Sequence, residues 1–149
     1  MDYTKGYKER NSGVDIADIK CEEFLESEKD IRYIRYGFDQ QNSRIPSKDF
    51  YLIPSTIRSQ PDFIVFRKKV IFLEVKGCKD ALRVKKCDIN AYKFWNNLMP
   101  LYFFIYSVTY RKHRIVSCLE LIKLTTISPI YTYSDNNKEY YQIDWETFD

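Results

Sequence analysis

Three residues capable of acid–base and metal chemistry stand at the mouth of a predicted β-hairpin. Asp62 directly precedes a short apolar run, and Glu74 and Lys76 fall near the end of a second run at residues 70–75. Residues two apart on a strand point to the same face of a sheet, so Glu74 and Lys76 share a side. A turn at residues 67–69 brings Asp62 opposite Glu74. We therefore predict that two carboxyl groups and one ammonium group converge at one end of an apolar sheet.

Burying such groups among apolar side chains is costly unless they pair or bind a cation. The carboxylates of Asp62 and Glu74, the backbone carbonyl of Val75 and water form an all-oxygen ligand set that suits Mg²⁺, for which we expect Mn²⁺ to substitute. Such an ion polarises a phosphoryl oxygen and lowers the pKa of an attacking water. Lys76 would orient that water or neutralise developing negative charge. The alternative is a salt bridge at the sheet edge without a chemical role.

The elements that hold these residues follow from the spacing of apolar side chains. We predict helices over residues 14–28 and, for the most part, 80–98, strands over 31–38 and 101–108, the hairpin over 63–75, and a short extended piece at 49–53. Asp15 is expected in the cap or first turn of the first helix. The order helix, three strands, helix, strand predicts an α/β sandwich around a mixed sheet.

The remainder of the chain gives weaker patterns. Residues 134–137 indicate a turn between two strands, whereas 115–124 cannot be assigned. We treat residues 1–149 as a single domain with its core at about 14–108. Residues 109–149 are then a C-terminal extension that contains strands.

Composition excludes several classes of protein. The 149 residues are 44% hydrophobic and 30% charged, which is typical of a globular domain and not of a disordered or membrane-embedded chain. A single histidine, His113, excludes multi-histidine zinc sites and argues against a nucleophile–histidine triad. Four cysteines without paired spacing, and no signal-peptide pattern, predict a reduced cytoplasmic chain without membrane association.

Charge is concentrated in one part of the sequence. Residues 67–114 contain twelve Lys and Arg against three acidic residues, a formal charge of +9 in a chain whose net charge is +3. Aromatic residues lie among these cations, a combination that attracts a phosphate backbone. The alternative is a solvated surface balanced by an acidic first helix. The expected nucleic-acid contacts are Lys79, Arg83, Lys85, Lys86 and Lys93.

The strings Pro61-Asp62 and Glu74-Val75-Lys76 resemble the signature of the PD-(D/E)XK nuclease superfamily, each in its expected strand context. The resemblance covers about residues 14–108 and implies a restriction-endonuclease-like αβββαβ core with a mixed central sheet flanked by helices. It also implies a Mg²⁺-dependent DNA endonuclease in which Asp62 and Glu74 are metal ligands and Lys76 is the catalytic lysine.

Further roles come from the same resemblance. Many members of the superfamily carry another acidic ligand on the first helix, and Asp18 is the best match here, with Glu22 as the second choice. Some members carry a glutamine on the helix after the lysine. This chain has none there, and Lys85, Lys86 or Asn90 would have to replace it.

Residues 51–55, shortly before Pro61-Asp62, are similar to the corresponding stretch of phage endonuclease I-type Holliday-junction resolvases. This local likeness favours branched or junction DNA as the substrate, with a homodimer as one way to present two sites. Two other functions stay open. One is a non-catalytic nucleic-acid-binding module of the same fold, and the other is an interaction protein whose aromatic segment 129–149 docks a partner or builds a dimer.

Overall fold

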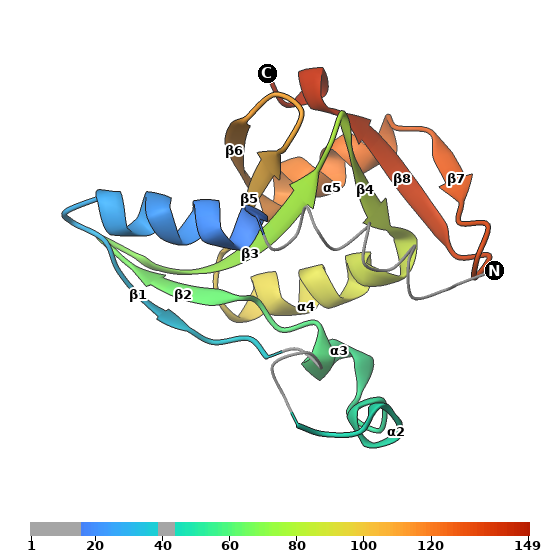
Figure 1. The fold of residues 1–149 in the computed structure, drawn as a ribbon, viewed down its shortest axis with the longest axis horizontal. Coiled ribbons are helices and arrows are strands. Elements are labelled where there is room, and N and C mark those ends of the chain that lie inside the picture. Colours follow the sequence, from blue (N-terminus) through green and yellow to red (C-terminus); the bar gives the residue numbers. More distant parts are fainter. Residues whose placement is uncertain (1–15, 39–43) are drawn as a thin grey trace.

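The computed structural model describes residues 16–38 and 44–149, and its largest element is a five-stranded mixed sheet (Figure 1). The strands are β1 (Arg32–Arg35), β2 (Phe63–Phe66), β3 (Val70–Cys78), β5 (Leu101–Ser107) and β6 (Lys112–Ser117). They lie in the order β1-β2-β3-β5-β6, and each neighbouring pair is antiparallel except β3 and β5, which are parallel. The predicted hairpin and the predicted strand at 101–108 are thus confirmed.

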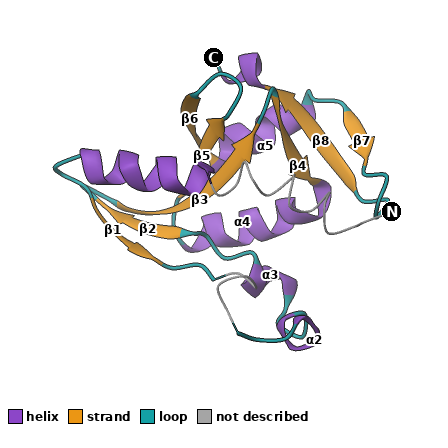
Figure 2. Ribbon diagram, viewed as in Figure 1, coloured by secondary structure: helices purple, strands orange, loops and turns teal. Residues whose placement is uncertain are grey.

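Helices cover both faces of this sheet (Figure 2). Residues 16–27 are helical, and their apolar stripe packs on one face, where Leu73 and Val75 of β3 lie. The helices α4 (Ile89–Leu98) and α5 (Cys118–Thr126) cover the opposite face. Because side chains alternate along β3, Glu74 belongs to the face that α4 covers. The predicted α/β class with a mixed sheet between helices is therefore correct, although Asp15 and the start of the first helix lie outside the described residues.

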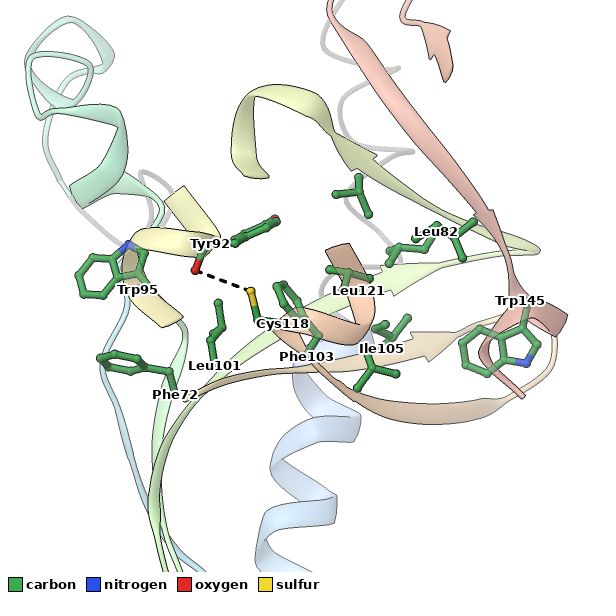
Figure 3. Close-up of a cluster of buried hydrophobic side chains, with 13 residues drawn as sticks. Phe72, Leu82, Tyr92, Trp95, Leu101, Phe103, Ile105, Cys118, Leu121 and Trp145 are labelled. Carbon is green, nitrogen blue, oxygen red and sulfur yellow. Dashed lines mark hydrogen bonds between the residues drawn. The ribbon is translucent and has the colours of Figure 1, made fainter. Parts of the chain in front are cut away.

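A second, three-stranded sheet lies beside the first. Its strands are β4 (Ala81–Lys85), β7 (Ile130–Thr132) and β8 (Glu139–Asp144), in the order β4-β8-β7, and the 3₁₀ helix η2 (Trp145–Phe148) follows β8. The predicted turn at 134–137 does connect two antiparallel strands. The inner side of this sheet joins the large core cluster, in which Leu82 and Trp145 lie near Ile105 and Leu121 (Figure 3).

The prediction of a mostly helical segment over residues 80–98 is wrong for its first half. Residues 81–85 form β4, the 3₁₀ helix η1 (Lys86–Asp88) follows, and α4 begins only at Ile89. Leu82 and Val84 are buried while Arg83 and Lys85 are exposed, which is the alternation of a strand. This alternation is visible in the sequence, but the pairing with β8, a long way along the chain, is not.

Residues 49–53 are also not extended as predicted. The short helices α2 (Ser47–Phe50) and α3 (Ser55–Arg58) occupy this region, each preceded by a proline that suits the start of a helix. They project from the body of the protein between β1 and β2 (Figure 1). The segment that resisted assignment, 115–124, is the end of β6 followed by α5. Within the described residues, no helix has the length and apolar character needed to cross a membrane.

Candidate active site

The hairpin of β2 and β3 brings Asp62 to the middle of the sheet. Phe63 pairs with Leu73, so Asp62, one residue before Phe63, comes opposite Glu74. The Asp62 carboxylate accepts a hydrogen bond of 2.7 Å from the backbone N–H of Val75. The two acids predicted to lie opposite each other therefore do so. At the end of β2, the Asp62 carboxylate takes the place of a backbone carbonyl as the partner of the Val75 N–H.

The backbone of Asp62 is held from the other side by the end of β1. Its carbonyl accepts hydrogen bonds from the N–H groups of Tyr36, at 2.8 Å, and Gly37, at 3.2 Å. A Cβ atom at Gly37 would lie 2.7 Å from the Pro61 carbonyl oxygen, closer than real Cβ contacts. Only glycine fits where these two backbones approach, and the approach fixes the position of Asp62.

Glu74 is a buried carboxyl group in an apolar sheet. Burial, together with the adjacent Asp62 carboxylate, raises the pKa of Glu74 well above its ordinary value, and the Lys76 ammonium offsets part of this effect. Glu74 is buried and Asp62 is only partly exposed, so the two like charges disfavour each other and the pair favours a proton or a cation. This is the electrostatic condition that a metal site satisfies.

Lys76 follows Glu74 on the same face of β3 and points to α4. Its Nζ atom lies 5.6 Å from the centre of the Tyr92 ring. Burial alone would lower the pKa of Lys76, but Tyr92, Glu74 and Asp88 together hold it well above the ordinary value. The lysine is therefore a fixed positive charge beside the two carboxyl groups.

Asp88 completes this side of the site. It lies at the junction of η1 and α4, and its side chain makes no capping hydrogen bond to the helix. Its negative charge instead acts on Glu74, Lys76 and Tyr92, whose pKa values it raises. Asp88 is thus electrostatically part of the site.

Asp18 approaches from the N-terminal helix through an arginine. Arg35 of β1 lies 3.5 Å from an Asp18 carboxylate oxygen and 3.9 Å from one of Asp62. Burial, followed by the Asp62 charge, raises the pKa of Asp18 to about 6, although Arg35 opposes the shift. The structure therefore brings Asp18 close to Asp62 but places the guanidinium group in contact with both.

The donor set fits a hard divalent cation only with water or substrate oxygens. Among residues 16–38 and 44–149, no group of three or more His, Cys, Asp or Glu is arranged to hold a metal. Mg²⁺ commonly takes one or two carboxylates and fills its other positions with water or phosphate oxygens. Asp62 and Glu74 can supply such a pair, and the Val75 carbonyl faces the same side as the Val75 N–H that meets Asp62.

The five predicted nucleic-acid contacts do not share one helix, although four of them fall within the segment 80–98 predicted to be mostly helical. Lys79 lies in the loop after β3, Arg83 and Lys85 lie on β4, Lys86 lies in η1 and Lys93 lies on α4. All five are exposed. Lys86 is 4.0 Å from Glu139, and Arg83 stacks on tyrosine rings. Their distribution follows from the strand at 81–85 that the helical interpretation missed.

Comparison with known proteins gives a likeness of fold. The chain superposes on the 1.6 Å structure of Archaeoglobus fulgidus Hjc, a Holliday junction resolvase, with a TM-score of 0.53, 10% identity, and coverage of 92% of this chain and 87% of that one. This protein has a restriction-endonuclease-like fold. D212, a nuclease from a fusselovirus, matches with a TM-score of 0.46 at 11% identity over 91% of this chain and 78% of its own. No protein-family model and no curated protein matches the sequence.

Three residues of this site escaped the sequence analysis. Arg35 lies in a segment whose sequence shows only the alternation of a strand, and its approach to Asp62 depends on the pairing of β1 with β2. Tyr92 is buried in the core, and its ring centre also lies 5.6 Å from the Nζ atom of Lys76. Asp88 precedes α4 as a cap would. In each case the missing signal is a long-range contact.

Proposed function

We propose that this chain is a metal-dependent DNA endonuclease that hydrolyses phosphodiester bonds at the site of Asp62, Glu74 and Lys76. One observation carries the proposal: Asp62 and Glu74 meet on a nuclease-type fold, with Lys76 two residues further on the same strand face. A structural ion pair does not need a second carboxyl group beside a buried one, because the repulsion between their charges destabilises the folded protein.

Asp62, Glu74 and the Val75 carbonyl would hold Mg²⁺, with Asp18 as an additional ligand if Arg35 moves away. The bound ion would polarise the scissile phosphate and lower the pKa of the attacking water. Asp62 is held for this task by the Val75 N–H and by the end of β1. Preorganised ligands of this kind lose little freedom when a cation arrives.

Lys76 supplies fixed positive charge where negative charge develops on the phosphorane. Its ammonium is kept charged and oriented by Tyr92, with Asp88 near both. A cation held in place before the reaction stabilises the transition state without reorganisation. In-line attack by water then breaks the bond between phosphorus and the leaving oxygen.

Branched or junction DNA is the substrate class that we favour. The support is the fold shared with an archaeal Holliday junction resolvase and the local sequence likeness of residues 51–55 to phage resolvases. A homodimer that presents two such sites remains a prediction.

Cleavage of a substrate panel tests the proposal. Plasmid, single-stranded, flapped and four-way DNA are incubated with wild-type protein and Mg²⁺ or Mn²⁺, beside Lys76→Ala and Asp62→Ala. We expect wild-type cleavage, and a loss of about 10²-fold or more in both variants, as for removal of other transition-state-stabilising groups. Binding of the same DNA in EDTA should change little.

Lys123→Ala is the matched control, since Lys123 is an exposed lysine on α5. It should cleave like the wild type. Absence of cleavage of every substrate by wild-type protein, with DNA binding retained and no divalent-ion binding by calorimetry, would replace the enzyme with a non-catalytic binding module.

A further inference from the structure

The outward side of the three-stranded sheet carries a row of tyrosine rings and cations. Lys85 pairs with Tyr140, and Tyr140 pairs with Tyr131, so these residues share one side of the sheet. Arg83 lies on the same side, because it alternates with the buried Leu82. We call the residues Arg83, Lys85, Tyr131, Tyr133 and Tyr140 the tyrosine face.

The rings of this face contact one another and the arginine. The ring centroids of Tyr133 and Tyr140 are 4.2 Å apart, and those of Tyr131 and Tyr140 are 5.9 Å apart at an interplanar angle of 30°. The Arg83 guanidinium lies 5.1 Å from the Tyr140 ring and 5.9 Å from the Tyr133 ring. Tyr140 is 8% exposed, whereas Tyr131 is 46% exposed and forms the open end of the stack.

The cations on this face have no acidic partner in the described part of the chain. Arg83 and Lys85 form no ion pair there, whereas Lys86 is 4.0 Å from Glu139. Stacking uses the flat surface of a guanidinium group and leaves its N–H edge for an anion. The face therefore combines ring surface for stacking with positive charge for phosphate.

We propose that the tyrosine face binds single-stranded nucleic acid, and that it leads the unpaired flank of a branched substrate to the site of Asp62, Glu74 and Lys76. Rings and cations together bind single strands by stacking bases and neutralising phosphates. A duplex keeps its bases inside the stack, so exposed rings would add nothing to its binding. This inference rests on the proposed nuclease function for the identity of its ligand.

The chain connects this face directly to the site. β4 begins three residues after β3 ends, and Lys85, at the end of β4, precedes Asp88 by three residues. Tyr92 follows Asp88 by four residues on α4, and its ring centre lies 5.6 Å from the Nζ atom of Lys76. A strand lying on the tyrosine face would thus pass Lys85 and Lys86 as it approaches the carboxyl groups.

The experiment measures fluorescence anisotropy of a labelled oligo-dT of about 20 nucleotides and of a duplex of the same length, in EDTA, between about 50 and about 200 mM salt. We expect Tyr131→Ala to weaken oligo-dT binding about 10-fold, as for loss of one stacked base, and to change duplex binding less than about twofold. Tyr131→Phe keeps the ring and should bind like the wild type. Arg83→Ala should weaken oligo-dT binding and reduce the salt slope by about one.

Two controls separate this inference from the proposed function. Tyr51→Ala removes another exposed tyrosine, on the projecting segment between β1 and β2, and should leave oligo-dT binding unchanged. If Tyr131→Ala binds oligo-dT as tightly as the wild type, or loses as much affinity for duplex as for oligo-dT, the proposed role of the tyrosine face is wrong. This holds even if Mg²⁺-dependent cleavage is observed. Conversely, a specific Tyr131→Ala effect in a protein that cleaves nothing would sustain the surface and reject the nuclease.

Discussion

The two sheets of this protein place charged side chains in different environments, mostly buried at the candidate site of one and exposed in the other. Within β3 of the five-stranded sheet, Glu74 is buried and Lys76 is only partly exposed, and charged or aromatic partners surround both. On the three-stranded sheet, Arg83 and Lys85 lie on the exposed side, and the Arg83 guanidinium lies over the rings of Tyr133 and Tyr140. A charge taken out of water needs fixed partners, whereas a solvated one does not. Substitutions of charged residues in the five-stranded sheet should therefore change activity or stability strongly. Those on the exposed side of the three-stranded sheet should have small effects that depend on salt.

Glu74→Gln should give the largest effect and should separate activity from stability. We expect cleavage to fall by about 10²-fold or more, because a metal-holding charge is lost. Since the folded protein raises the pKa of this carboxyl group, its ionisation destabilises the fold as pH rises above the ordinary value. In EDTA at neutral pH the variant should therefore be more stable than the wild type and should melt at a higher temperature. An unchanged or lower melting temperature would show that the ionised glutamate is well compensated by Lys76.

Ile143→Ala tests whether the two sheets form one cooperative unit. Ile143 of β8 is 1% exposed and belongs to the core cluster that also contains Phe103 and Ile105 of β5. Truncating a buried isoleucine costs about 2–5 kcal/mol. Chemical denaturation should show one transition shifted by this amount. A second transition, with the five-stranded sheet still folded, would mean that the comparison concerns two separately stable units.

Asp18→Asn should alter how stability depends on pH. The folded protein raises the pKa of Asp18 from 3.8 to about 6. The neutral form is favoured, so the stability that this group contributes is present below pH 3.8 and is lost as pH rises to about 6. Denaturant unfolding in EDTA at several pH values should show the variant gaining on the wild type across this interval and holding its advantage above it. A difference that is constant with pH would mean that Arg35 neutralises Asp18 throughout.

Lys85→Ala should have the smallest effect on stability. Lys85 is exposed at the end of β4, and substitution of such a residue usually changes stability by less than about 0.5 kcal/mol. We expect thermal unfolding to be unchanged and the salt dependence of nucleic-acid binding to be slightly weaker. A loss of stability comparable with that of Ile143→Ala would contradict the distinction between the two sheets.

The sequence predicts most reliably the parts of this molecule whose partners are near in the chain. The hairpin that joins Asp62 to Glu74 closes through a turn of three residues, so spacing alone places both acids. The helix at 16–27 and the strand β5 likewise show their own periodicity. These elements include the carboxyl groups and the lysine, which is why the candidate site could be predicted.

What the sequence leaves out depends on distant contacts. β4 forms because β8, more than fifty residues later, pairs with it, and Arg83 and Lys85 then leave the predicted helix for an exposed sheet face. Arg35 reaches Asp18 only after β1 pairs with β2 across the segment that contains α2 and α3. A periodic pattern read over ten residues holds no information about such pairings. Tyr92 shows a further limit, because one buried ring packs in the core and also lies beside Lys76 in the site.

Gly37 carries no functional group, yet its lack of a side chain determines the position of the Asp62 carboxylate. Any other residue would push the Pro61 carbonyl away and displace the backbone of Asp62. In a library randomised at positions 18 and 37 and selected for cleavage, position 37 should therefore accept fewer amino acids than position 18. An apparently inert position would then be among the least replaceable in the protein.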